Sequence, residues 1–245
     1  MEKKTQIMKF KIRLLLIIAL ISFQFVGAQK SGLKLGTSIT DSVVIQKVST
    51  PIFRLELGST NPKQAGNQFS TTYFNGGRIG GTVEFDLKHN FSFLTGALYS
   101  LVYSNKVQNY TFTDSVRYKT FAHSIDIPLQ INYNLPLGKN LKLIAFAGSN
   151  INVGLAQPQK VQVFMTDEQK GFYPNITAKE YADNDLYKNA LIHRINFQMV
   201  LGGGVQWRDY QVKGGYNFGI NNINRIDSSL SLRQSGWFVS VAYQF

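Results

Sequence analysis

The segment Ser235 to Phe245 constrains the fold more than any other part of the chain. Its odd-numbered positions from Trp237 on are large and apolar, whereas the alternate positions are mostly small or polar. Because side chains of a strand alternate between two faces, this pattern predicts a strand with one wholly apolar, aromatic face. The last residues of a chain are usually loosely ordered and polar. A C-terminal strand with an aromatic face therefore predicts that this face contacts lipid.

The first 28 residues have the three-part layout of a secretory signal peptide. Five basic residues precede the apolar run Leu14 to Ile21, and Val26-Gly27-Ala28 offers small residues suited to cleavage before Gln29. The alternative is an N-terminal membrane anchor, but the uninterrupted run is shorter than the roughly 20 residues that span a bilayer. We therefore expect residues 1–28 to be a signal peptide and residues 29–245 to form one barrel domain.

Composition narrows the classes of protein further. The formal charge of +12 falls to +8 for residues 29–245, and the bases are scattered singly instead of forming the clusters typical of nucleic-acid binding. We expect no nucleic-acid partner and regard lipopolysaccharide phosphates or an anionic partner surface as the counter-charges. The chain contains no cysteine, which excludes disulfides and thiolate metal sites.

Alternating segments recur along the whole chain. The expected strands are 32–40, 78–87, 91–104, 123–135, 141–155, 194–207, 211–220 and 235–245. Each has one mostly apolar face and one face of small, polar and occasional charged residues. Pro128 falls inside the strand 123–135 and predicts a bulge or local break there, because proline cannot donate a ladder hydrogen bond.

Connection lengths give an independent test of topology. Joins at 88–90, 136–140 and 208–210 are short, whereas those at 105–122, 156–191 and 221–232 are long. Outer-membrane barrels have short periplasmic turns and long external loops, so only an odd number of crossings can precede 78–87. We expect 32–40 to be the first spanning strand, with 41–77 outside and 52–58 extending the sheet above the membrane. The exchange of these roles between 32–40 and 52–58 is the open alternative.

The expected fold is therefore an all-β, antiparallel, up-and-down transmembrane barrel of eight strands in the bacterial outer membrane. A soluble barrel of lipocalin type is the competing interpretation. In that fold the second face would be the wet surface, yet it is rich in glycine, carries Leu94, Leu98, Ile144 and Phe146, and lacks dense charge. The narrow interior of an eight-stranded membrane barrel accommodates such a mixture.

Four sequence elements resemble the PorT-like family of outer-membrane β-barrels, which is similar to small eight-stranded barrels of OmpX type. They are G-L-K-L-G at 32–36, F-S-F-L-T-G-A-L-Y-S at 91–100, I-D-I-P-L-Q-I-N-Y at 125–133 and the aromatic C-terminus. The terminal strand also resembles the signal that the barrel-assembly machinery reads. The resemblance implies an architecture, an outer-membrane location and, for some members, a role in secretion or gliding; it brings no catalytic motif.

Charged residues on the small, polar face are expected to lie in the lumen, where they must be paired or hydrated. They are Lys34, Arg78, Glu84, Asp126, Lys142, Arg194 and Lys213. A structural network of ion pairs and water is the favoured interpretation, and a small-anion site or a gated leak is the alternative. An eight-stranded barrel leaves no room for an open solute channel.

No catalytic, cofactor-binding or metal residues are predicted. Some membrane barrels are lipid A deacylases or acyltransferases that use His and Ser, and His123, Ser124 and His193 lie at the external height that such chemistry needs. Adjacent residues of a strand point to opposite faces, however, so His123 and Ser124 cannot bond directly.

The predicted function is a non-catalytic outer-membrane component with a structural or docking role, in contact with lipid and lipopolysaccharide. The external segments 41–77 and 156–191 are expected to meet a protein or glycan partner, because 156–191 is long and carries exposed aromatic residues. A lipid-modifying barrel enzyme is the alternative function.

Overall fold

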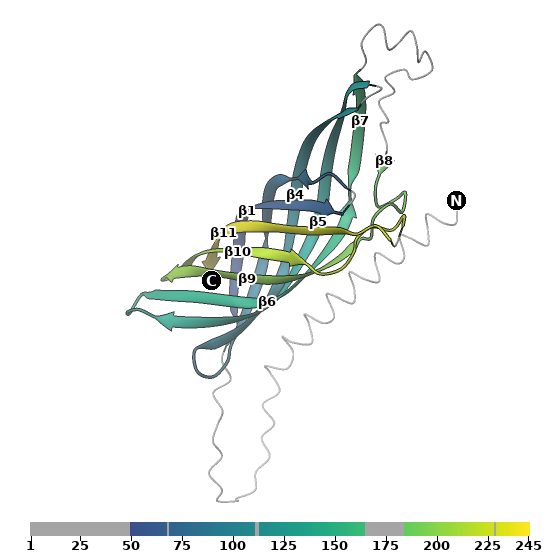
Figure 1. Ribbon diagram of the computed structural model, residues 1–245. Coiled ribbons are helices and arrows are strands. Elements are labelled where there is room, and N and C mark those ends of the chain that lie inside the picture. Colours follow the sequence, from purple (N-terminus) through teal and green to yellow (C-terminus); the bar gives the residue numbers. More distant parts are fainter. Residues whose placement is uncertain (1–49, 68, 111–112, 165–183, 228) are drawn as a thin grey trace, which may run out of the picture. The chain divides into compact units, whose positions relative to one another are not determined.

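Eight strands form a closed antiparallel ring in the computed structural model, which describes residues 50–67, 69–110, 113–164, 184–227 and 229–245. The described residues contain eleven strands in all, eight of them in the ring. They are β1 (Ile52–Gly66), β2 (Thr72–Tyr73), β3 (Asn75–Asp86), β4 (Phe91–Tyr110), β5 (Thr113–Pro136), β6 (Leu141–Ala156), β7 (Pro158–Phe164), β8 (Asn184–Asp185), β9 (Ile195–Trp207), β10 (Tyr210–Gly219) and β11 (Leu232–Gln244). The ring follows the order β1, β3, β4, β5, β6, β9, β10 and β11, and β1 pairs with β11 to close it (Figure 1).

The register fixes the dimensions of the barrel. A ladder followed from Phe238 reaches Val102 of β4 through β1 and β3. Followed the other way, through β10, β9, β6 and β5, it reaches Ser92 of the same strand. These two residues are ten positions apart, so the shear number is ten. With this shear, eight strands tilt by about 40° from the barrel axis, within the usual range for membrane barrels.

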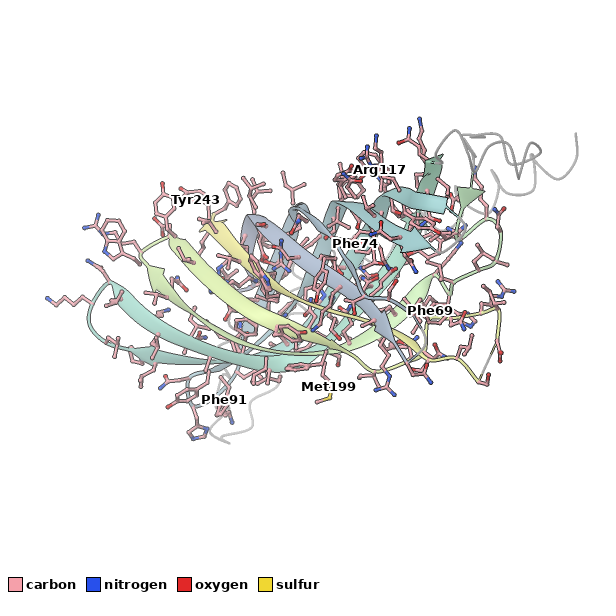
Figure 2. The ribbon with its side chains drawn as sticks, turned by 45° about the horizontal axis from the view of Figure 1, so that its top comes forward. Phe69, Phe74, Phe91, Arg117, Met199 and Tyr243 are labelled. Atoms are coloured by element: carbon pink, nitrogen blue, oxygen red, sulfur yellow. The ribbon has the colours of Figure 1, made fainter. Side chains whose placement is uncertain are left out.

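The predicted division between the two faces is confirmed. Alternate side chains on all eight ring strands are exposed and apolar, among them Leu57, Ile131, Met199, Trp237 and Tyr243. Tyr243 and Met199 point away from the barrel in Figure 2. The other set is buried inside, where an apolar cluster contains Ile144, Phe146, Val200 and Phe238. No helix of the described residues is long and apolar enough to cross a membrane.

The choice of the first spanning strand was wrong. β1 pairs with β11 from Arg54 to Gly66 and with β3 from Ile52 to Thr60, so both of its edges are occupied and the ring is complete. The segment 52–58, the alternative, therefore begins the barrel, and 32–40 lies outside the described residues. The parity argument itself holds, since one crossing precedes β3.

Three expected loops are also corrected. The segment 41–77 is not an external loop, because β1 occupies 52–66 and the outer join to β3 is only 67–74. The segment 105–122 is mostly strand: β4 and β5 stay paired out to Tyr110 and Thr113. Within 156–191, β7 pairs with β5, and 165–183 lies outside the described residues.

The short turns and the proline position agree with expectation. His89 and Asn90 both have positive φ, the conformation of a tight hairpin turn, and Leu87 N–H donates to Phe91 O at 2.7 Å. The β4–β5 ladder omits Ile127 and Pro128 and then resumes in the same register, which is the local break predicted at Pro128. The pairing of β5 with β6 continues through Pro128.

Candidate functional site

The periplasmic half of the lumen holds a network of five buried charged residues, which we call the inner network. β1 contributes Arg54 and Glu56, β3 contributes Arg78 and Glu84, and β10 contributes Lys213. Arg54 pairs with Glu84, Arg78 pairs with Glu56, and Lys213 Nζ lies 2.6 Å from Glu56 Oε2. Glu56 is thus shared by two cations, and the network has three bases for two acids.

Neutral side chains complete the inner network. Ser92 donates to Glu84, and the amides of Asn132 and Asn134 donate to the same carboxylate at 3.2 Å. Arg54 donates to Gln206 and Gln244 at 3.4 Å, near the periplasmic strand ends. Buried charges are tolerated when they are paired and hydrogen-bonded in this way, so the inner network fits the predicted structural filling of the lumen.

An apolar layer lies against the inner network. The Arg78 guanidinium sits 3.9 Å from the centre of the Phe238 ring, and Phe238 stacks with Phe146 at 6.3 Å. Gly202 makes room for these rings, because a Cβ there would lie 2.3 Å from Phe146 Cζ. The glycine triplet 202–204 therefore serves ring packing and wall curvature, as expected for glycine in a barrel strand.

The outer half of the lumen has a different chemistry. Asp126 is buried there and accepts hydrogen bonds from Ser100 (2.6 Å), Asn150 (3.0 Å) and Asn152 (2.8 Å). Ser100, Asp126 and Asn152 adjoin a cavity of about 30 Å³, which is room for about one water molecule. Phe74 and Tyr187 line the same cavity from the external side.

The structure buries four of the seven predicted lumen charges and brings three of them together. Arg78, Glu84 and Lys213 meet in the inner network, and Asp126 lies in the outer half. Lys142 and Arg194 are exposed at strand ends, whereas Lys34 lies outside the described residues. Sequence reasoning missed Arg54 and Glu56 because β1 was not taken as a spanning strand. Their alternation with Phe53, Leu55 and Leu57 was the available signal.

The three residues considered for catalysis do not form a site. His123 Nδ1 lies 2.6 Å from the Tyr99 hydroxyl, whereas Ser124 accepts from Asn152 inside the lumen. His123 and Ser124 therefore face opposite sides of the wall, as predicted. His193 is exposed and lines an open external hollow of about 410 Å³ with Arg194, Arg225 and neighbouring loop residues.

Loop side chains cap the outer end of the barrel. Tyr187 lies against Gly154, and the Arg194 guanidinium is 5.2 Å from the centre of its ring. Burial raises the pKa of Tyr187 to about 12, so its hydroxyl stays protonated at neutral pH. Among the described residues, no group of three or more His, Asp, Glu or Cys side chains is arranged to hold a metal ion.

Beyond the ring, three strands continue as a projecting sheet, which we call the extension (104–110 of β4, 113–120 of β5, and β7). β5 pairs with β4 on one side and with β7 on the other. Figure 1 shows these three strands running past the ends of the other ring strands. Arg117 is labelled on the extension in Figure 2. Lys106 ties the base of the extension to the join 67–74 by donating to Ser70 O at 2.7 Å.

The comparisons agree with this architecture. A family model described as an outer membrane protein beta-barrel domain matches residues 28–225. The chain belongs to this family. It is accordingly a β-barrel protein of the bacterial outer membrane, with the lipid-facing surface and closed ring described above.

Similar solved structures are remote in sequence. Neisserial surface protein A is 11% identical with a TM-score of 0.41, and the match covers 79% of this chain and 97% of that one. The attachment invasion locus protein Ail of Yersinia pestis is 9% identical with a TM-score of 0.34, covering 79% of this chain and 98% of that one. No curated protein matches the sequence. The architecture therefore rests on the strand pairing and the family match.

Proposed function

We propose that residues 29–245 act as a non-catalytic docking component of the outer membrane, with the extension as the contact surface for a protein or glycan partner. The observation that carries the proposal is the contrast between a filled lumen and a sheet that continues into the external medium. The inner network and the Phe146–Phe238 layer occupy the lumen, and an eight-stranded barrel is too narrow for an open solute channel beside such side chains. We therefore assign the function to binding at the external surface and not to transport through the lumen.

The extension suits a docking role because it is ordered by pairing instead of being a loose loop. β4 and β5 pair without interruption from Leu98 through Gln108, past the aromatic pair Tyr103 and Phe121. Val107 is 52% exposed on this sheet, an apolar side chain in a region that the barrel does not need to span the membrane. Binding residues presented on a rigid scaffold lose little entropy on association.

Further parts of the proposal concern the family and the cellular context. The quoted sequence elements support a PorT-like affiliation, with a role in secretion as one setting for docking. The basic, apolar and small-residue regions of 1–28 support a signal peptide. The exposed face of β11 supports recognition of the terminal strand by the barrel-assembly machinery, and the lipid-facing wall supports contact with lipopolysaccharide.

Shortening the extension tests the proposal. Residues 107–117 would be replaced by Asn-Gly, so that the ladder partners Lys106 and Tyr118 flank a two-residue hairpin and the ring strands stay intact. Photo-crosslinking from position 109 in the full-length protein and from Leu137 in a periplasmic turn would first identify partners specific to the external side. We expect the shortened barrel to insert and to lose those partners.

Recovery of the same partners in wild-type yield with the shortened, correctly inserted barrel would contradict docking through the extension. A mass-spectrometric comparison of lipid A from cells with and without the gene addresses the lipid-modifying alternative. Unchanged lipid A is expected; altered acylation would favour an enzyme and make His123 and His193 the first residues to substitute.

A further inference from the structure

Two lysines face each other on the outward surface of the extension. Lys119 of β5 and Lys160 of β7 are direct partners in the antiparallel ladder, so their Cβ atoms lie about 5 Å apart. Arg117, two residues along β5, shares their face. Directly opposed like charges destabilise a sheet, so this pairing calls for a counter-charge.

Among the residues that the structure describes, little neutralises the pair. The other described partners on the same face are neutral: Asn105 and Val107 on β4, and Gln162 on β7. Asp185, which pairs with Pro158, uses its carboxylate to accept backbone hydrogen bonds from Gln157, Tyr187 and Lys188. Lys160 is exposed and Lys119 is half-buried, so both side chains can reach a group outside the sheet.

The height of the lysines above the membrane follows from two aromatic pairs on the β4–β5 hairpin. Phe91 packs on Tyr133 near the periplasmic turn, with ring centres 5.1 Å apart, and Tyr103 packs on Phe121 farther out, at 4.8 Å. Between the two pairs β4 advances 12 residues. With a strand tilt of about 40°, this advance corresponds to roughly 30 Å along the barrel axis, the height of an apolar band with its aromatic girdles.

Tyr103 and Phe121 thus mark the outer interface, and Lys119 lies two residues beyond Phe121 on the same face. An advance of two residues along a strand with this tilt corresponds to about 5 Å along the barrel axis. Lys119 therefore lies at the level of the headgroups, whereas Phe121 lies at the edge of the hydrocarbon. Lysine side chains also extend toward an interface from such a position.

We propose that Lys119 and Lys160 form a binding site for a phosphate group of the glycolipid in the outer leaflet. The inference rests on the part of the proposed function that surrounds the barrel with lipopolysaccharide, and it is independent of the protein partner. A phosphate between the two ammonium groups removes their repulsion and anchors the base of the extension to the membrane surface.

The test uses barrels recovered in detergent from outer membranes of cells that express the full chain. Native mass spectrometry would measure binding of diphosphoryl lipid A and of dephosphorylated lipid A. The wild type should prefer the diphosphoryl form, and Lys119→Ser/Lys160→Ser should bind it about tenfold more weakly. Lys119→Arg/Lys160→Arg should retain binding, because the charge remains.

Lys139→Ser/Lys142→Ser is the matched control, since it removes two exposed lysines at the periplasmic end and should leave binding unchanged. Equal affinity of the lysine-to-serine variant and the wild type would overturn the site while leaving lipopolysaccharide contact intact. Absence of any phosphate preference in the wild type would also overturn the site, whereas failure to bind either form of lipid A would overturn lipopolysaccharide contact; neither comparison needs a variant to fold.

Discussion

The two halves of the lumen fill the same barrel with different chemistry. The periplasmic half is held by charges, with Glu56 shared between Arg78 and Lys213 beside the stacked rings of Phe146 and Phe238. The outer half is held by amides around one carboxylate, Asp126, and retains a cavity of about 30 Å³. Removing one partner of a buried ion pair lowers the free energy of unfolding strongly, because the other charge stays buried without a counter-charge. Removing one partner of a neutral hydrogen bond lowers it less.

This difference indicates that the two halves of the lumen contribute differently to the stability of the barrel. The periplasmic half fixes the mutual register of β1, β3 and β10, which surround the closure with β11. The outer half has looser filling directly beneath the external loops and the extension. We therefore expect substitutions in the inner network to cost the most stability and those in the outer half to be tolerated.

Glu56→Gln should have the largest effect. It leaves Arg78 and Lys213 buried without a full counter-charge, and we expect a loss of about 3 kcal/mol in the free energy of unfolding. Guanidinium unfolding of the detergent-solubilised barrel, followed by tryptophan fluorescence, would measure it. Glu56→Gln/Lys213→Met should recover part of the loss, and a single variant as stable as the wild type would remove the contrast between the halves.

Tyr187 gives an intermediate effect that depends on pH. Its pKa is raised to about 12 by burial, compared with about 10 in an unfolded chain, so its contribution to stability is complete below pH 10 and declines as pH rises toward 12. Between pH 8 and pH 11 the wild type should lose about 1 kcal/mol relative to Tyr187→Phe. The measurement is guanidinium unfolding of both proteins at the two pH values. A constant difference between them would show that the ring does not cap the outer half as described.

Asp126→Asn should have the smallest effect. The side-chain oxygen of Asn can still accept from Asn150 and Asn152, and the Ser100 hydroxyl can accept from the new amide. We expect a change below about 1 kcal/mol in either direction in the same unfolding assay. A loss as large as that of Glu56→Gln would mean that the outer half also depends on charge.

Most of the barrel wall could be predicted from the sequence, because the alternation of apolar and polar residues distinguishes the side chains that face lipid from those that face the lumen. The β11 face from Trp237 to Phe245 and the faces of β3 through β6 agree with the structure, apart from strand-end residues such as Lys142. Alternation alone could not choose between 32–40 and 52–58, since both have it. Hydrogen bonding of β1 to both β3 and β11 decides the choice, and pairing between segments 180 residues apart leaves no local signal.

The extension and the ion pairs escaped prediction for related reasons. Above the membrane neither face of a strand meets lipid, so Asn105 to Gln108 look like a polar loop although they pair with β5. The charges that fill the lumen could be assigned to a face, but their partners could not. Arg54 and Glu84 meet only because the ring places β1 beside β3.

Disulfide trapping across the β1–β11 seam tests the closed ring most directly, and the chain has no cysteine to interfere. Leu57 and Val241 are paired across this seam, with both side chains exposed on the lipid face. Leu57→Cys/Val241→Cys should oxidise to an intramolecular disulfide in intact outer membranes, whereas Leu57→Cys/Leu143→Cys, with the second cysteine on β6, should not. Failure of the first pair together with rapid crosslinking of Leu35→Cys/Val241→Cys would contradict the ring and restore 32–40 as the closing strand.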